Sequence, residues 1–305
     1  LNTDDHDYMI TAFDFNGNES ETSEVLTSQS IQLNSGWEGI SGYVVPSYPG
    51  VENVFEVVSD ELILLQNMTG VYWPSQNINT IGNWDYHSGY YLKTNGETTL
   101  PIIGQKVPES ALSLSQGWNL IPVLSTCETD VAGLFEGQDV IIIKEVAGIN
   151  LYWPEMNINT LGHLQPGKAY FVLMETAGEI TFPDCTPEMK GKATNETGNV
   201  VLLNAYNVTP TPNSHIIAFD ANMLFDFDNF KNWEILAYDT DGRCFGAGNL
   251  EENSLVLFGD DPTTEVKDGF MEYDPVQLTV VNAKTGDKYF CEVDYDFTYP
   301  NHEGL

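Results

Sequence analysis

The sequence contains one long motif twice. Residues 71–84 read VYWPSQNINTIGNW, and residues 151–164 read LYWPEMNINTLGHL. A recurrence of this length indicates a duplicated structural unit. The similarity continues towards the amino terminus, where residues 31–37 align with residues 112–118. The sequence therefore predicts two copies of one small domain, and this duplication constrains the fold more than any other feature of the chain.

Each copy is predicted to consist of strands. Short runs of β-branched and aromatic residues alternate with Gly, Pro and Asn, a pattern typical of strands and turns rather than helices. Residues 62–65 (LILL) align with residues 140–143 (VIII) as an apolar strand. We expect copy 1 to span residues 30–107 and copy 2 to span residues 108–187. Both are expected to be small β-sandwich or barrel-like modules.

The first residues carry a different pattern. Residues 8–14 alternate like a strand, and residues 16–18 (NGN) supply a hairpin turn. The stretch 8–26, YMITAFDFNGNESETSEVL, resembles the last two strands of a fibronectin type III domain. Two strands alone are only marginally stable in water. We therefore expect residues 1–29 to be the final strands of such a domain in a longer chain, with pairing to another domain or subunit as the alternative.

Residues 188–305 form the third predicted region. The run at residues 235–238 is typical of a strand, and the pairs at residues 241–242 (DG) and 285–286 (TG) mark hairpin turns. We expect an antiparallel β-sandwich here. The only helix-like stretch, residues 222–233, is weak. The whole chain is therefore expected to be all-β.

The charge of the chain limits its partners. Acidic residues outnumber basic ones by 45 to 11, which gives a formal net charge of −34. Such a surface repels nucleic-acid phosphates and anionic membranes, because both are bound through Lys and Arg. It is compatible with cations, with neutral ligands such as glycans, or with solubility alone. No apolar run approaches the about 20 residues of a membrane-spanning helix, so we expect neither nucleic-acid binding nor membrane insertion.

The four cysteines indicate an exported protein. Cys127, Cys185, Cys244 and Cys291 form no CxxC pair and do not have the spacing of a metal site. An even number of cysteines without metal spacing fits two disulfides, which persist in oxidising surroundings. We expect Cys127 to pair with Cys185 across copy 2, and Cys244 to pair with Cys291 in the third region. The protein is expected to be secreted and to lie at the cell surface.

Three further stretches complete a recognisable pattern. Residues 238–248 read YDTDGRCFGAG, residues 259–264 read GDDPTT, and residues 268–270 read DGF. Together with the GW…YWP…GY pattern of the copies, they resemble the modular secreted and cell-surface proteins of Bacteroidota-type bacteria. The resemblance covers most of the chain and implies its domain architecture. It implies no particular activity, because such modules accompany adhesins, hydrolases and fibres alike.

Copy 1 departs from the shared pattern at two places. The residue after the shared Trp is Glu38 in copy 1 and Asn119 in copy 2. Residues 86–88 (YHS) stand where copy 2 has residues 166–168 (PGK). We therefore expect the turn before Tyr90 to differ from its counterpart in copy 2.

The sequence carries no signature of catalysis. Its five histidines are scattered and form no HExxH motif. A GxSxG elbow, a Walker loop and a dinucleotide-binding fingerprint are all missing from the sequence. Carboxylates are abundant, but the separation that a glycosidase pair requires cannot be read from a sequence. We expect no enzymatic activity in this chain.

The loop of residues 259–269 is the candidate cation site. Ca²⁺ takes about six to eight oxygen ligands, which clustered carboxylates and backbone carbonyls supply. Asp260, Asp261 and Asp268 provide such carboxylates, although their spacing is not that of an EF-hand. These three residues are the candidate ligands of a structural Ca²⁺, and a solvated acidic turn is the competing interpretation.

Aromatic residues found in only one copy are the candidate ligand contacts. The tryptophans shared by both copies are expected to pack the β-cores, because an indole fills a small domain efficiently. The shared tryptophans are Trp37, Trp118, Trp73 and Trp153. Sugars stack on exposed aromatic faces and form hydrogen bonds with neighbouring polar groups. Trp84, Tyr86, Asn83 and Asp85 are therefore the candidates for a glycan contact, although ordinary partial burial is the favoured interpretation.

These features favour a non-catalytic extracellular segment of a larger modular protein. We expect it to act in cell adhesion or as part of an extracellular fibre or stalk, with a surface glycan, a protein or other copies of itself as partner. The alternative is a set of carbohydrate-binding accessory modules of a secreted glycoside hydrolase or peptidase.

Overall fold

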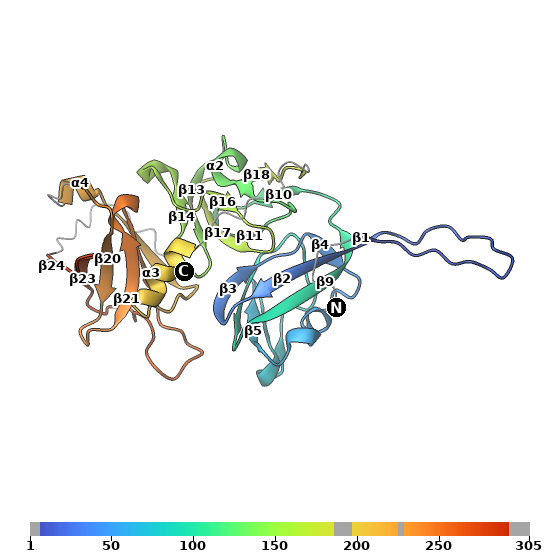
Figure 1. Cartoon of the computed structure of the whole chain (residues 1–305), viewed down its shortest axis with the longest axis horizontal. Coiled ribbons are helices and arrows are strands. Elements are labelled where there is room, and N and C mark those ends of the chain that lie inside the picture. Colours follow the sequence, from blue (N-terminus) through green and yellow to red (C-terminus); the bar gives the residue numbers. More distant parts are fainter. Residues whose placement is uncertain (1–6, 186–196, 225–228, 293–305) are drawn as a thin grey trace. The chain divides into compact units, whose positions relative to one another are not determined.

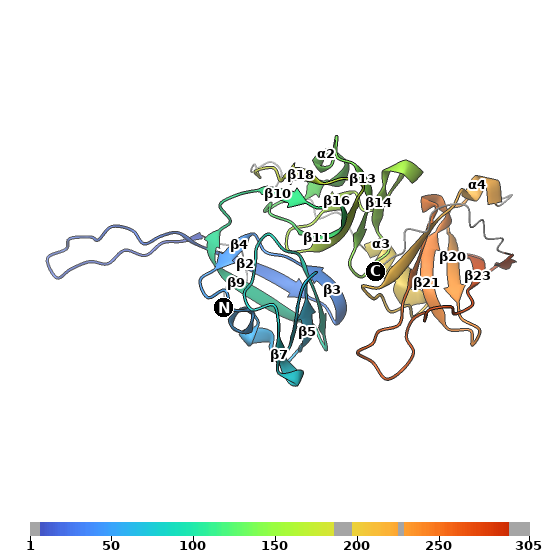
Figure 2. The same ribbon diagram turned by 180° about the vertical axis from the view of Figure 1, so that it is seen from behind.

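The structure is a computed structural model that describes residues 7–185, 197–224 and 229–292. The chain is all-β, as predicted: its sheets are antiparallel and its helices are short (Figures 1 and 2). It forms two compact units. One contains Leu1–Val140 and His163–Lys192, and the other contains Ile141–Gly162 and Ala193–Leu305.

The amino-terminal residues form an extended hairpin that leads into copy 1. β1 (Asp7–Tyr8) pairs with β2 (Leu26–Leu33), and Phe13 bridges Glu19 near the turn. The turn predicted at residues 16–18 is confirmed, since Gly17 donates its N–H to the carbonyl of Asp14 at 3.0 Å. β2 begins before residue 30 and continues into the first sheet of copy 1. The strand therefore crosses the predicted boundary between the first two regions.

Copy 1 contains two antiparallel sheets. The first has the strand order β1-β2-β9-β4, and the second has the order β3-β8-β5-β6-β7. Each contributes fully buried leucines to the interior, such as Leu33 and Leu100 from the first and Leu65 and Leu92 from the second. The further elements of copy 1 are β3 (Gly36–Ile40), β4 (Val44–Pro46), α1 (Val51–Val54), η1 (Glu56–Val58), β5 (Leu62–Gln66), β6 (Val71–Trp73), η2 (Pro74–Gln76), β7 (Ile78–Asn79), β8 (Tyr90–Thr94) and β9 (Thr98–Lys106).

Copy 2 repeats the second sheet of copy 1. Its five strands have the order β11-β17-β13-β14-β15, and every residue of the second strand, β17, is buried. Two short pairs, β10 with β18 and β12 with β16, complete the module. The elements are β10 (Ala111–Leu114), β11 (Gly117–Pro122), β12 (Thr129–Asp130), α2 (Val131–Leu134), β13 (Val140–Glu145), β14 (Leu151–Trp153), η3 (Pro154–Met156), β15 (Ile158–Asn159), β16 (His163–Leu164), β17 (Ala169–Met174) and β18 (Gly178–Thr181).

The repeated motif forms the same corner in both copies. β6 and β14 each run into a single 3₁₀ turn, which ends at Asn77 or Asn157 with a φ of 55°. Asn tolerates this left-handed conformation better than most residues, because its short polar side chain can hydrogen-bond locally. The chain then returns as β7 or β15. The first Asn of the motif is thus required by the backbone.

The rest of the motif closes that corner. Thr80 Oγ1 accepts the N–H of Val71, and Asn79 Oδ1 accepts the N–H of Gly82, both at 2.9 Å. The two equivalent bonds in copy 2 have the same length. The second Asn and the Thr of the motif thus each satisfy a backbone N–H group of the corner in both copies.

The carboxyl-terminal region is one six-stranded antiparallel sheet of order β19-β22-β21-β20-β23-β24. The hairpin turns predicted at residues 241–242 and 285–286 connect β20 to β21 and β23 to β24. α3 was not predicted, and among the described residues of the helix-like stretch 222–233 only residues 222–224 are helical, as part of α4. The elements are α3 (Thr197–Ala205), β19 (Ser214–Ala218), α4 (Ala221–Leu224), β20 (Trp233–Tyr238), β21 (Cys244–Asn249), η4 (Leu250–Glu252), β22 (Ser254–Phe258), β23 (Gln277–Asn282) and β24 (Lys288–Cys291).

Two glycines of β21 allow close packing of this sheet. A Cβ atom at Gly248 would lie 2.0 Å from the carbonyl oxygen of Ser254, and one at Gly246 would lie 2.8 Å from that of Val256. Real side chains cannot approach backbone so closely, so only glycine fits. The GAG sequence at residues 246–248 therefore has a structural cause.

One of the two predicted disulfides is present. Cys127 and Cys185 are bonded, with their Cα atoms 5.8 Å apart. They lie 58 residues apart in the sequence, near the start and the end of copy 2. In the chain-entropy model, closing a loop of this length stabilises the folded state by about 3–5 kcal/mol.

The other predicted disulfide is wrong, because Cys244 and Cys291 are both free thiols. Cys244 is on β21 and Cys291 is on β24, and β20 and β23 run between these strands. Neighbouring strands are about 4.8 Å apart, so three spacings place the two cysteines about 14 Å apart. A disulfide requires Cα atoms within about 7 Å of each other. The sequence indicated strands for both residues but not the order of those strands in the sheet.

Candidate functional site

The acidic loop of residues 259–269 is held by its own carboxylates. Asp260 Oδ1 accepts the N–H of Asp268 at 2.8 Å, and Asp268 Oδ1 accepts the N–H of Asp261 at 3.0 Å. Asp261 Oδ1 accepts the N–H and the hydroxyl of Thr263 at 2.9 and 2.7 Å. The three aspartates of the calcium prediction therefore do share one loop, and each accepts a backbone N–H within it.

The metal prediction receives no further support from this geometry. Among the described residues, no group of three or more His, Cys, Asp or Glu side chains is placed to hold a metal ion. The loop keeps its conformation through carboxylate-to-amide hydrogen bonds, which are charge-assisted and stronger than neutral ones. Calcium at Asp260, Asp261 and Asp268 stays a prediction.

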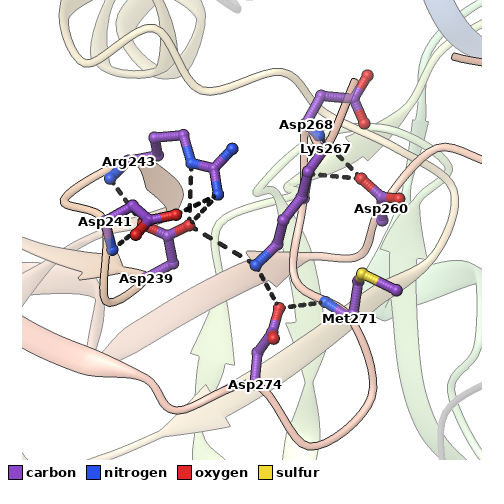
Figure 3. A network of polar contacts seen from close by, with 9 residues as sticks. Asp239, Asp241, Arg243, Asp260, Lys267, Asp268, Met271 and Asp274 are labelled. Atoms are coloured by element: carbon purple, nitrogen blue, oxygen red, sulfur yellow. Dashed lines mark hydrogen bonds and ion pairs between the residues drawn. The ribbon is translucent and has the colours of Figure 1, made fainter. Parts of the chain in front are cut away.

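A second carboxylate, Asp239, organises the turn between β20 and β21 (Figure 3). It is only 2% exposed, and its side chain accepts the N–H groups of Asp241 and Arg243 at 3.0 and 2.9 Å. The Arg243 guanidinium also binds it, with Nη2 at 2.8 Å. Burial raises the pKa of Asp239, but the hydrogen bonds and charge of Arg243 outweigh it and hold the pKa below 3.8.

Lys267 joins this turn to the long loop between β22 and β23. Its Nζ lies 3.6 Å from Asp239 Oδ2 and 2.7 Å from Asp274 Oδ2 (Figure 3). The hydrogen bond that Lys267 donates to Asp274 raises the pKa of Lys267, and the same bond lowers the pKa of Asp274. Arg243 and Lys267 also lie over the ring of Phe245, at 5.5 and 5.8 Å from its centroid. Two of the few cations of this chain thus fasten two loops together.

The end of the long loop has an unusual backbone. Tyr273 has a φ of +67°, a left-handed conformation that is rare for a bulky residue. Asp274 holds the surrounding turn, because its Oδ2 accepts the N–H of Met271 at 2.7 Å and its own N–H bonds to the Met271 carbonyl at 3.1 Å. Tyr273 itself is 91% exposed. Tyr273 was not among the predicted site residues, since nothing in the sequence signals a positive φ at a Tyr.

The predicted glycan contact is wrong at Trp84. Its side chain is 5% exposed and stacks on buried Tyr90, with ring centroids 4.4 Å apart. A buried indole offers no face to a sugar. Asp85 is exposed but caps its own turn through the N–H of His87, while Asn83 is exposed and Tyr86 half-buried. Only the three residues beside the tryptophan remain accessible, and sugar binding by them stays a prediction.

Copies 1 and 2 are joined by hydrogen bonds around Ser41, which is fully buried. Its N–H donates to the carbonyl of Gly167 at 2.9 Å, and its hydroxyl donates to the carbonyl of Lys168 at 2.5 Å. The same hydroxyl accepts the N–H of Val123 at 3.0 Å. Gly89 of copy 1 also donates its N–H to a carbonyl of copy 2, that of Leu120, at 3.0 Å. Three backbone N–H groups thus have their hydrogen-bond acceptor in the other copy.

The two differences between the copies form an ion pair at this interface. Lys168 Nζ of copy 2 lies 2.7 Å from Glu38 Oε2 of copy 1, and the Glu38 side chain is 10% exposed. Glu38 Oε1 also accepts the N–H of Asn34 at 2.6 Å. In copy 2, the shorter Asn119 makes the equivalent bond to the N–H of Ser115 at 2.9 Å and extends no charge. Copy 1 therefore has a negatively charged Glu where copy 2 has a neutral Asn, and this charge lies opposite Lys168 of copy 2.

Aromatic side chains from both copies complete the interface. Tyr91 of β8 contacts Phe171 of β17, with ring centroids 6.0 Å apart. Trp37 packs on Tyr91 within copy 1, and Trp118 packs edge-on against Phe171 within copy 2. The shared tryptophans Trp37 and Trp118 thus support the rings that meet between the copies, and both are partly buried.

Comparisons with protein-family models, with curated proteins and with solved structures gave no match to this chain. In the part of the chain that the structure describes, no helix has both the length and the apolar character needed to cross a membrane.

Proposed function

We propose that this chain is a non-catalytic segment of an exported modular protein, in which copies 1 and 2 act as one rigid block of an adhesive or fibre-forming structure. The observation that carries the proposal is the interface between the copies, in which Ser41 bonds to three residues of copy 2. A stalk transmits force or position only if its domains do not move freely against each other. Backbone hydrogen bonds, an ion pair and ring packing together restrict such motion.

The connection between the copies supports the same role. β9 ends at Lys106 and β10 begins at Ala111, so few residues link the modules. Val107 in this linker is buried, and its N–H donates to the carbonyl of Tyr43 at 3.1 Å. Domains move relative to each other by default unless their interface is well packed. A short and docked linker makes the fixed arrangement more favourable, because little conformational entropy remains to be lost.

Export is supported by chemistry that suits the cell exterior. The Cys127–Cys185 disulfide would be reduced in most cytosols. The charge of −34 disfavours nucleic acids and anionic membranes as partners. Resemblance to modular surface proteins of Bacteroidota-type bacteria agrees with this setting, and membership of that group is part of the proposal.

The carboxylates with the clearest roles support a structural reading. Asp239 and Asp274 have lowered pKa values and are bound to Arg243 and Lys267. A general acid or base operating near neutral pH requires the opposite shift, towards pH 7. These side chains are therefore suited to hold loops rather than to transfer protons.

A glycan array and a hydrolysis panel on the full chain test the proposal. We expect no retained glycan and no product from polysaccharide or peptide substrates. Binding of a glycan, lost on replacement of Asn83 or Tyr86, would favour carbohydrate-binding accessory modules instead. Turnover that survives repeated purification would refute the non-catalytic role.

A further inference from the structure

Three large apolar side chains are exposed on the loop between β22 and β23. Val266 is 70% exposed, Met271 is 57% exposed and Tyr273 is 91% exposed. Val266 and Tyr273 are direct sequence neighbours of Lys267 and Asp274, which form an ion pair, and the N–H of Met271 bonds to Asp274. We call these three residues the apolar loop patch. Single exposed apolar residues are normal, but grouped ones on a functional loop mark interaction surfaces.

The loop is fixed rather than loose at this patch. The Lys267–Asp274 contact of 2.7 Å closes the loop on itself, and Lys267 also approaches buried Asp239 of the neighbouring turn (Figure 3). Asp274 in addition bonds the N–H of Met271. Tyr273 is held between these anchors in its left-handed conformation. Strained residues that the surroundings hold in place are concentrated at binding sites, where the strain preorganises a contact.

We propose that the apolar loop patch binds a second protein, through an apolar surface on that protein that is surrounded by Lys and Arg. The inference rests on the proposed function, since it names the kind of partner to which an adhesive segment would attach. Tyr and Met are enriched at the centre of protein interfaces, where Tyr supplies large contact area at low entropic cost.

The charge around the patch selects a basic partner. Glu265 and Glu272 are exposed beside Val266 and Met271, whereas the nearby cation Lys267 is already bound to two aspartates. The whole chain carries a net charge of −34. Complementary charge speeds encounter and excludes partners of like charge, so an acidic rim favours a cationic ring on the other surface.

A protein fits the patch better than a sugar does. A sugar-binding site uses flat aromatic faces together with polar groups that hydrogen-bond to the hydroxyls of the sugar. Tyr273 is the one ring of the patch, and its other two members, Val266 and Met271, offer no second aromatic face. They do offer apolar area, which stabilises a protein contact through its removal from water.

Selection from a random-peptide display library tests the proposal on the full chain. We expect the enriched peptides to combine apolar residues with net positive charge. The Tyr273→Ala variant should bind a synthetic enriched peptide at least about tenfold more weakly, as central interface tyrosines commonly do. The matched control is Tyr48→Ala, which removes a tyrosine that is 76% exposed on copy 1 and should leave affinity unchanged.

Met271→Ser provides a second, independent variant and should also weaken the peptide, while added salt should slow its association. Enriched peptides that bind Tyr273→Ala as tightly as the wild type would overturn the proposal. So would enrichment of neutral or acidic peptides, the enrichment of none, or a glycan that binds only when Tyr273 is present. The peptide results leave the rigid block of copies 1 and 2 unaffected, because amide hydrogen exchange tests that block separately, whereas a bound glycan would also count against the proposed function.

Discussion

At the scale of single residues, three of the few basic side chains of this acidic protein form ion pairs that hold parts of the chain together. Lys168 binds Glu38 across the copies, and Lys267 and Arg243 bind Asp239 in the carboxyl-terminal region. Exposed ion pairs contribute little, because water screens them and holding long side chains costs entropy. These three pairs each include a carboxylate that is largely buried. Their loss should therefore be measurable.

The Glu38–Lys168 pair is expected to stabilise the joined copies. Lys168→Met should lower the free energy of unfolding by about 1–2 kcal/mol, because it leaves a largely buried carboxylate without its cation. Urea unfolding measures the change. Glu38→Gln combined with Lys168→Met should cost less than the sum of the single changes. Lys106→Met removes an exposed lysine and serves as the control; equal losses in both lysine variants would contradict the assignment.

Acid should weaken the carboxyl-terminal loops. The pKa values of Asp239 and Asp274 lie below their ordinary 3.8 in the folded state. Depressed carboxylate pKa values contribute stability that is present above the unfolded pKa and is lost as pH falls through the folded one. The melting temperature should therefore fall when the pH is lowered below about 4. In Asp239→Asn this fall should be smaller than in the wild type. An identical acid profile in the variant would argue against Asp239 as the cause.

At the scale of elements, the five-stranded sheets of the two copies have the same strand order, but other parts of the copies differ. The corner after β6 and β14 is built identically, down to the left-handed Asn and the Thr hydroxyl. Beyond it the copies diverge, because copy 2 has the disulfide and a hairpin strand that reaches the carboxyl-terminal region. On that strand, β13, Lys144 is buried and donates to Ser214 Oγ at 2.7 Å and to the carbonyl of Pro212 at 3.3 Å.

The left-handed conformation of Asn157 predicts that a glycine is tolerated there but a valine is not. Asn157→Gly should leave stability nearly unchanged, since glycine adopts a positive φ freely. Asn157→Val should cost about 1–2 kcal/mol or more, because a branched Cβ clashes in the left-handed conformation. Thermal unfolding of the two variants measures the difference. If valine and glycine prove equally stable, the corner does not depend on that φ.

Lys144 should give the protein a pH-dependent anchor. Burial lowers the pKa of Lys144 from 10.5 to about 8. Between these values the unfolded chain binds the proton and the folded chain does not, so this residue makes unfolding harder as pH rises. The stability of wild type relative to Lys144→Met should therefore increase from pH 8 towards pH 10. A difference that is constant over this range would contradict the lowered pKa.

Much of this fold could be predicted from the sequence, and the misses have physical causes. The duplication and the strand runs were readable because period and turn residues are local signals. Which strands neighbour each other is not local, so the pairing of Cys244 with Cys291 was predicted wrongly. Trp84 was a candidate for a glycan contact because it lacks a counterpart in copy 2, yet its stacking on Tyr90 depends on tertiary packing. Glu38 and residues 166–168 were noticed as differences, but their contact emerges only in space.

At the scale of the whole molecule, the interface between copies 1 and 2 limits how a longer assembly could form. The strands of copy 1 and copy 2 that meet are equivalent ones, β8 with β17 through Tyr91 and Phe171. An interface between equivalent surfaces closes on itself and leaves no matching surface for a third module. The copies therefore form a complete pair, and any longer assembly must use other surfaces, of which the apolar loop patch is the one proposed above.

The central claim is that copies 1 and 2 form one rigid block in solution, and amide hydrogen exchange tests it most directly. The N–H groups of Ser41, Gly89 and Val123 each donate to an acceptor in the other copy. If the block stays closed, these three amides should exchange as slowly as amides inside β8 and β17, because only global unfolding releases them. Exchange of all three at the rate of exposed amides, while β8 and β17 stay protected, would show that the copies separate and would contradict the account.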